Sequence, residues 1–146
     1  MKSLSLSPLL AFVLWGCGPE GQRFHGVYHV TGTAHFSVQN FANFSAPLVD
    51  AFRVSEGTTT DFLLTDPAGR CLLLANLEGE VATLQSGSCT WGHNGATLTL
   101  TLTRGTVAFS GTSAQLHISG TATVTAQGKL HLGTFFQSAT LHYRGP

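Results

Sequence analysis

Strict alternation of apolar and polar residues over long stretches most constrains the fold of this 146-residue chain. Within residues 26–38, apolar residues and glycine occupy the even positions and, from His29 onward, polar residues occupy the odd positions, and residues 97–103 and 114–126 repeat this pattern. Because successive side chains of a β-strand point to opposite faces, the alternation predicts strands with one buried and one exposed face. The chain is therefore expected to form an antiparallel sheet with one solvated face.

Turn residues divide the chain into short connections. Residues 66–69 have the composition of a type I turn, and residues 78–79, 104–105 and 127–128 are typical of hairpins. We expect about eight strands joined as an antiparallel meander, some of them about 12 residues long. Strands of this length favour an all-β fold closed as a small barrel, with a β-sandwich as the alternative.

Two segments depart from a simple strand pattern. Apolar residues in Phe41–Phe52 recur at helical spacing, which predicts either a short helix across one barrel end or an edge strand. Near Phe135 the alternation changes phase, because Leu130 and Leu132 occupy even positions whereas the later apolar residues occupy odd positions. A β-bulge beside Gly133 would keep both groups on the inner face.

The charge composition excludes one class of partner. Seven basic and seven acidic side chains give a formal net charge of zero, so the chain lacks the basic surface that nucleic-acid binding requires. We find no sequence motif for hydrolysis or phosphate binding and expect no cofactor. The sequence therefore predicts a non-enzymatic binding or interaction module, with a hydrolase or a metal-binding protein as alternatives.

The N-terminal segment has the organisation of an export signal. Lys2 supplies a positive charge, residues 4–14 form an apolar run, and Leu14-Trp15-Gly16-Cys17 follows. The run is too short to span a membrane, which takes about 20 apolar residues. Such a segment is typical of a cleaved targeting peptide.

Residues 14–17 resemble the lipobox of bacterial lipoproteins. The resemblance implies that residues 1–16 are a signal peptide and that Cys17 carries the acyl chains that attach the protein to a membrane. It also implies the outer membrane of a bacterium, with the protein facing the periplasm or the cell surface. Residues 17–24 would then form a lipid-proximal tether and residues 25–146 a single all-β domain. Cleavage at another position, with Cys17 incidental, is the alternative.

Cys71 and Cys89 lie almost symmetrically about the expected turn at residues 78–81. Neighbouring strands would bring the two side chains face to face, and an exported chain meets oxidising conditions. We therefore expect a disulfide, with a metal or redox pair as the alternative. Residues 69–75 and 82–89, together with the N-terminus, resemble small uncharacterised bacterial lipoproteins. This resemblance implies the disulfide and the envelope location and names no activity.

Aromatic and polar side chains supply the candidate sites. An eight-stranded barrel has room for one small apolar ligand, so a lipocalin-like carrier is a further alternative. The candidate ligand-binding residues are Phe41, Phe44, Phe52, Phe135 and Phe136. The histidines on the expected polar strand faces, which are candidate metal ligands, are His29, His35, His117 and His131. Threonine rows at residues 97–103 and 121–125 face either an ordered partner such as a glycan or simply solvent. The partner, whether protein, glycan or small hydrophobic molecule, stays open.

Overall fold

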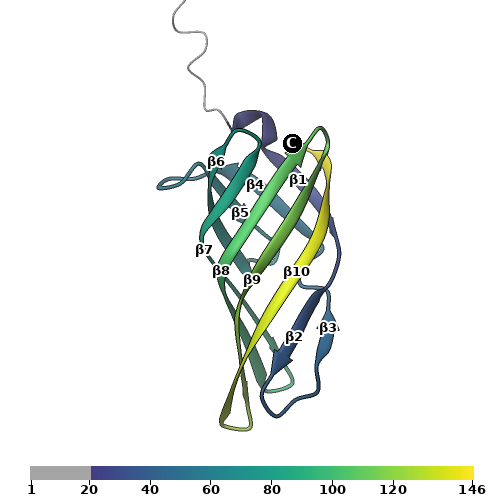
Figure 1. The fold of residues 1–146 in the computed structure, drawn as a ribbon, viewed down its shortest axis with the longest axis vertical. Coiled ribbons are helices and arrows are strands. Elements are labelled where there is room, and N and C mark those ends of the chain that lie inside the picture. Colours follow the sequence, from purple (N-terminus) through teal and green to yellow (C-terminus); the bar gives the residue numbers. More distant parts are fainter. Residues whose placement is uncertain (1–20) are drawn as a thin grey trace, which may run out of the picture.

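The computed structural model describes residues 21–146, which form an antiparallel β-barrel (Figure 1). A short 3-10 helix, η2 (Gln22–Phe24), precedes ten strands. Their bounds are β1 (Gly26–Thr31), β2 (Ala34–Val38), β3 (Phe44–Ala46), β4 (Ala51–Glu56), β5 (Phe62–Thr65), β6 (Cys71–Glu78), β7 (Val81–His93), β8 (Ala96–Ser110), β9 (Ser113–Ala126) and β10 (Lys129–Gly145).

The barrel closes through its first and last strands. The hydrogen-bonded order is β1-β4-β5-β6-β7-β8-β9-β10-β2-β3, and β10 also pairs with β1. Eight strands, β1 and β4 to β10, therefore form the closed barrel, and β2 and β3 extend the sheet beyond β10. The eight-stranded antiparallel barrel expected from the alternation is confirmed, and the sandwich alternative is not adopted.

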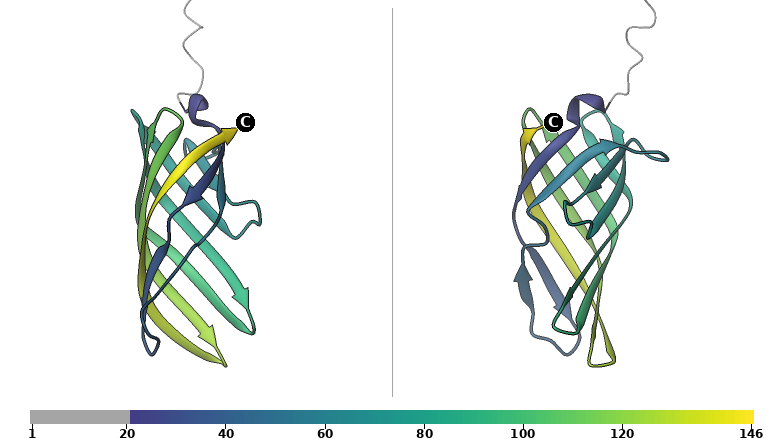
Figure 2. Two further views of the ribbon diagram at one scale, coloured as in Figure 1. Left: turned by 90° about the vertical axis from the view of Figure 1, so that its right-hand side faces the viewer. Right: turned by 180° about the vertical axis from the view of Figure 1, so that it is seen from behind.

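The two ends of the barrel carry different elements. The upper end, as drawn in Figure 1, carries η2, the C-terminus and the β6–β7 and β8–β9 hairpins. The lower end carries the β7–β8 and β9–β10 hairpins, with β2 and β3 beside them (Figure 2). Strand β6 begins at Cys71, opposite Cys89, so residues of β7 beyond Thr90 pair with β8 alone. Ring closure by β6 is therefore confined to the upper part of the molecule.

Strand β10 is long enough to pair with two strands in succession. Its C-terminal half pairs with β1 and its N-terminal half with β2. Between these strands Gly32 has a φ of 145°, and a Cβ there would lie 2.6 Å from the carbonyl oxygen of Ser138. Glycine is required at this close approach, and it divides the single strand expected over residues 26–38. The expected alternation is confirmed, because the apolar even positions of β1 and β2 are buried.

Residues 41–52 contain no helix. Phe44–Ala46 forms β3, an edge strand that pairs with β2, and β4 begins at Ala51. The predicted short helix across one barrel end is therefore wrong, and the edge-strand alternative is correct. Phe44 stacks on Phe36 of β2, whereas Phe52 is buried in the barrel core. Phe44 and Phe52 therefore pack from two separate strands, and this tertiary packing outweighs the helix tendency of the local sequence.

Aromatic side chains fill the upper end of the barrel. The Phe24 ring stacks on Phe109 at a centroid distance of 4.3 Å, and Phe62 packs edge-on against both rings. Gly21 makes room for this cluster, because a Cβ there would collide with the Phe62 ring. Below the cluster, the largest fully buried side chains are Leu64, Leu73, Leu100, Val107, Leu116 and Leu141. The interior of the closed part is therefore packed with side chains.

The folded domain begins earlier than residue 25. Phe24 is buried, and its carbonyl oxygen accepts a hydrogen bond of 2.8 Å from the Tyr28 hydroxyl. Residues 21–24, expected to lie in the tether over residues 17–24, thus belong to the barrel. The expected signal peptide, residues 1–16, and Cys17 lie outside the described residues. Between residues 21 and 146 no helix has the length and apolar character needed to cross a membrane.

The alternation of β10 continues without a change of phase, contrary to the expectation. Its odd positions face inward from His131 to Leu141, whereas Leu130 and Leu132 are 62% and 52% exposed on the outer face. The β9–β10 register runs from Lys129 to His142 without a shift, so the bulge expected beside Gly133 does not form. Since the pleat alternates strictly, the tightly packed C-terminal half of the strand decides which residues of the other half face inward.

Three of the expected turns are confirmed. The Gly69 amide donates a 3.0 Å hydrogen bond to the Asp66 carbonyl oxygen, and hairpins turn at residues 79–80 and 127–128. Arg104-Gly105, expected to form a hairpin, instead lies inside β8. The register to β9 shifts there, and a Cβ at Gly105 would collide with Leu84, so the glycine serves close packing and not a turn.

The β7–β8 hairpin turns at Asn94-Gly95, which was not among the expected turns. Both residues are left-handed, with φ of 50° and 80°. Two consecutive left-handed residues are typical of a type I′ turn, for which Asn-Gly is a preferred pair. The pattern could therefore have been found from the sequence.

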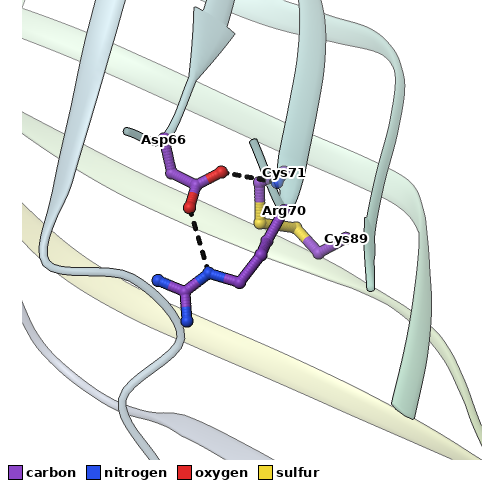
Figure 3. The surroundings of a disulfide bond; sticks show 4 residues. All are labelled: Asp66, Arg70, Cys71 and Cys89. Atoms are coloured by element: carbon purple, nitrogen blue, oxygen red, sulfur yellow. Dashed lines mark hydrogen bonds and ion pairs between the residues drawn. A yellow bond between two sulfur atoms is a disulfide. The ribbon is translucent and has the colours of Figure 1, made fainter. Parts of the chain in front are cut away.

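A disulfide joins β6 to β7, as predicted. Cys71 and Cys89 are direct cross-strand partners, with an S–S bond of 2.05 Å and Cα atoms 4.0 Å apart. The buried carboxylate of Asp66 accepts hydrogen bonds from the Cys71 amide at 2.7 Å and from Arg70 Nε at 3.2 Å (Figure 3). Burial acts to raise the pKa of Asp66, but these hydrogen bonds and the Arg70 charge outweigh it and hold the pKa below its ordinary value. The turn at residues 66–69 is thus tied to the disulfide.

Candidate functional site

A hollow of about 470 Å³ lies where β2, β3 and the N-terminal half of β10 meet. The residues that line it are His35, Phe36, Ser37, Asn43, Phe44, Ser45, Thr134, Phe135 and Phe136. The edge position of β3, which pairs with β2 alone among the described strands, places this hollow at the lower side of the molecule (Figure 1). It is therefore built on the two strands that do not take part in barrel closure.

Two aromatic stacks border the hollow, one on each face of these strands. Phe36 is buried and stacks on Phe44 at 4.7 Å and on Phe135 at 6.1 Å between ring centroids. On the other face of the same strands, the His35 ring stacks on Phe136 at 4.8 Å. Phe44 and Phe136 keep 38% and 56% of their surface exposed. Each face of these strands therefore exposes one large ring, and exposed aromatic rings are common at binding surfaces.

Uncharged polar groups complete the lining. His35 Nδ1 and Ser45 Oγ are 2.7 Å apart and share a hydrogen bond, and Asn43 and Thr134 add an amide and a hydroxyl. None of the nine lining residues is Asp, Glu, Lys or Arg. Aromatic faces with a few neutral donors and acceptors suit an uncharged ligand that has both apolar and hydroxylated parts.

An exposed apolar strip runs along the outer face of β10 toward the hollow. Leu130, Leu132 and Phe136 share this face with Thr134 and are each more than half exposed. We call these four residues the β10 strip. Four consecutive outward positions, three of them large and apolar, form a continuous exposed patch, and such patches are common at interaction sites.

The threonine rows expected on the sheet surface are brought into register beside the β10 strip. Three pairs of β8 and β9 residues face each other directly: Thr97 with Thr125, Thr99 with Thr123, and Thr101 with Thr121. In the pairing of β9 with β10, Thr123 lies opposite Leu132 and Thr125 lies opposite Leu130. The outer wall of the lower part thus carries hydroxyl groups in ordered pairs next to an apolar strip.

The candidate phenylalanines separate into two groups. Phe44, Phe135 and Phe136 come together at the hollow, whereas Phe52 is buried in the core and Phe41 contacts His131 edge-on at 4.8 Å. Sequence reasoning missed Phe36, Ser37, Asn43, Ser45 and Thr134 as lining residues. Alternation placed Phe36 on a buried face, but its pairing with Phe135 joins strands almost 100 residues apart, which no local pattern indicates.

The four candidate metal-binding histidines do not cluster. His29, His35 and His117 lie on the outer faces of β1, β2 and β9, where His117 Nδ1 and Ser138 Oγ are 2.9 Å apart. His131 was expected on the polar face but faces inward, because β10 keeps its phase. In the described part of the chain no three His, Cys, Asp or Glu side chains are grouped so that they could hold a metal ion.

Comparison with known proteins adds no assignment to this geometry. The chain matches no family model, no curated protein and no solved structure.

Proposed function

We propose that this protein is a non-enzymatic binding module of a bacterial cell envelope, and that its partner is an uncharged glycan chain. The β10 strip carries this proposal, because it exposes Leu130, Leu132 and Phe136 along one line that leads to the hollow. The paired threonines beside it supply hydroxyl groups for hydrogen bonds. Sugar rings present apolar C–H faces and hydroxyl edges, which match the aromatic and hydroxylated parts of this surface.

The neutral lining supports this class of ligand over a charged one. Charged ligands are held in proteins by paired charges or metal ions, and the nine residues of the hollow include no Asp, Glu, Lys or Arg. The formal net charge of zero likewise provides no long-range attraction for a polyanion.

We further propose that acyl chains on Cys17 attach the protein to the outer membrane. Three residues lie between Cys17 and Gly21, and an extended chain spans at most about 14 Å over these four residue steps. Gly21 packs against Phe62 at the upper end of the barrel. A membrane anchor at Cys17 would therefore hold the upper end close to the lipid and direct the lower end, with its binding surface, away from it.

The glycan proposal is tested by affinity electrophoresis in gels that contain single neutral polysaccharides, namely dextran, xylan and a mixed-linkage β-glucan. We expect one of them to retard the wild-type protein. Phe136→Ala and Leu132→Ser should each weaken that retardation about ten-fold, since truncating a central contact residue costs 1 kcal/mol or more. Leu72→Ser is the matched control, because Leu72 is 45% exposed on β6 and lies far along the sheet from β10. Equal loss in Leu72→Ser and Leu132→Ser, or no retardation by any of the three, would contradict the proposal.

The anchor is tested separately by detergent-phase partitioning of the protein expressed in a Gram-negative host. Wild-type protein should enter the detergent phase. Cys17→Ala should remain full-length and stay in the aqueous phase. Cleavage and partitioning of Cys17→Ala like the wild type would show that Cys17 is not the anchor.

One observation favours a second function, the binding of a small hydrophobic molecule at the lower end. Trp91, Leu98, Val124 and His131 are successive cross-strand partners from β7 to β10 and are only partly buried. His131 Nδ1 is buried without a hydrogen-bond partner. A hydroxyl group of a bound ligand would supply that partner. Native mass spectrometry after mild extraction should then show a bound small molecule, which His131→Phe would release. An unliganded mass for the extracted wild-type protein would reject this second function.

A further inference from the structure

A pair of histidines faces outward where the barrel closes. His29 of β1 and His142 of β10 are direct cross-strand partners in the antiparallel register. Their neighbours Val30 and Leu141, which are also direct partners, are buried in the core. Because side chains alternate along each strand, both imidazole rings lie on the outer wall, His29 half-buried and His142 exposed.

Direct cross-strand partners are close enough to share one metal ion. Their Cβ atoms lie about 4.5–5.5 Å apart in an antiparallel pair, and an imidazole extends far enough from each Cβ for two ring nitrogens to meet at one ion. Strand closure holds both backbones in place, so the ligands are brought together before the ion binds. The sequence separates these residues by more than 100 positions, and only the β1–β10 pairing joins them.

We infer that His29 and His142 form a two-histidine site for a divalent transition metal ion, with Cu²⁺ bound more tightly than Zn²⁺. Imidazole nitrogen is a preferred ligand of both ions, and affinity for a given set of nitrogen ligands is highest for Cu²⁺. No third His, Cys, Asp or Glu of the described residues completes a larger group, so water molecules fill the remaining positions. This site lies on the closed part of the wall, away from the hollow and the β10 strip, and does not depend on the proposed glycan binding.

The site is tested by calorimetric titration of the protein, purified without a histidine tag, with CuCl₂ and separately with ZnCl₂. We expect one site per chain, tighter for Cu²⁺. His29→Ala and His142→Ala should each weaken Cu²⁺ binding about ten-fold or more, because the second ligand otherwise binds intramolecularly. The double variant should lose the site altogether, because no imidazole remains there to coordinate the ion. His117→Ala is the matched control, an exposed histidine on the outer face of β9, and should keep wild-type affinity.

Circular dichroism melting should show that all four variants keep the wild-type fold, as expected for side chains on the outer wall. Electron paramagnetic resonance of the Cu²⁺ complex should show two coordinated nitrogen atoms in the wild type and one in either single variant. Wild-type affinity in His29→Ala, in His142→Ala or in the double variant would overturn the inference.

Discussion

The carboxylate of Asp66 accepts a hydrogen bond of 2.7 Å from the amide of Cys71, the residue whose sulfur is bonded to Cys89. One turn, one strand and one covalent cross-link therefore meet at a single buried carboxylate (Figure 3). Strand β6 begins at this point, so the contact decides where ring closure by β6 starts.

Removing the disulfide should destabilise the barrel strongly. Cys71 and Cys89 are 18 residues apart, and closing a loop of this length lowers the entropy of the unfolded chain enough to be worth about 3 kcal/mol. Cys71→Ala with Cys89→Ala should lower the free energy of unfolding by about that amount in urea titrations. Reduced wild-type protein should behave like the double variant. An unchanged urea midpoint in both samples would show that the cross-link does not stabilise the fold.

Acid should weaken the fold through Asp66. Its pKa in the folded state lies below the ordinary value of 3.8, so its stabilising contribution is complete above pH 3.8 and is lost as the pH falls through the folded pKa. Asp66→Asn should lower the free energy of unfolding by about 2 kcal/mol at pH 7, since it removes a buried charged acceptor. As the pH is lowered, the free energy of unfolding of this variant should fall less steeply than that of the wild type. Glu80→Gln, at an exposed hairpin tip, serves as the control in urea titrations from pH 7 to pH 2. If the free energy of unfolding falls as steeply with acid in Asp66→Asn as in the wild type, Asp66 does not cause the acid sensitivity.

Alkali should weaken the fold through Tyr28. Burial, together with the nearby Tyr143, raises the pKa of the Tyr28 hydroxyl above its ordinary value of 10.0. The unfolded chain therefore ionises first, and the contribution of Tyr28 is complete below pH 10 and is lost as the pH rises through the folded pKa. Tyr28→Phe should cost about 1 kcal/mol at pH 7, because the Phe24 carbonyl loses its donor. Absorbance titration at 295 nm should show one fewer late-ionising tyrosine in this variant than in the wild type.

Gly32 should tolerate no side chain. A Cβ would lie 2.6 Å from the Ser138 carbonyl oxygen and 2.8 Å from the Ala139 Cβ, at a φ that L-residues rarely adopt. Gly32→Ala should therefore lower the free energy of unfolding by about 2 kcal/mol or more. Gly92→Ala is the control, because the nearest atom to its Cβ is 3.9 Å away. Equal thermal midpoints for the two variants would argue against a close approach at Gly32.

The candidate site was only partly predictable. Phe44, Phe135 and Phe136 were selected by residue type, because large aromatic side chains are common at binding surfaces, and all three line the hollow. Their partner Phe36 joins them only through the β2–β10 register. The β10 strip was predicted on the wrong face, since Leu130 and Leu132 were expected to be buried. Apolar residues near the open end of a strand do not by themselves indicate which face is inside.

Local patterns in the sequence determined most of the long β-strands, the buried faces of β1, β2, β8 and β9, the turns at residues 66–69, 79–80 and 127–128, and the Cys71–Cys89 disulfide. These features depend on the period-two pleat and on residues within one hairpin, so neighbouring residues suffice to predict them. Tertiary structure alone decided the edge-strand form of β3, the phase of β10 and the meeting of His29 with His142. Each of these follows from pairing between distant strands, in which ring closure and packing of the common core select one register among many that the alternation allows.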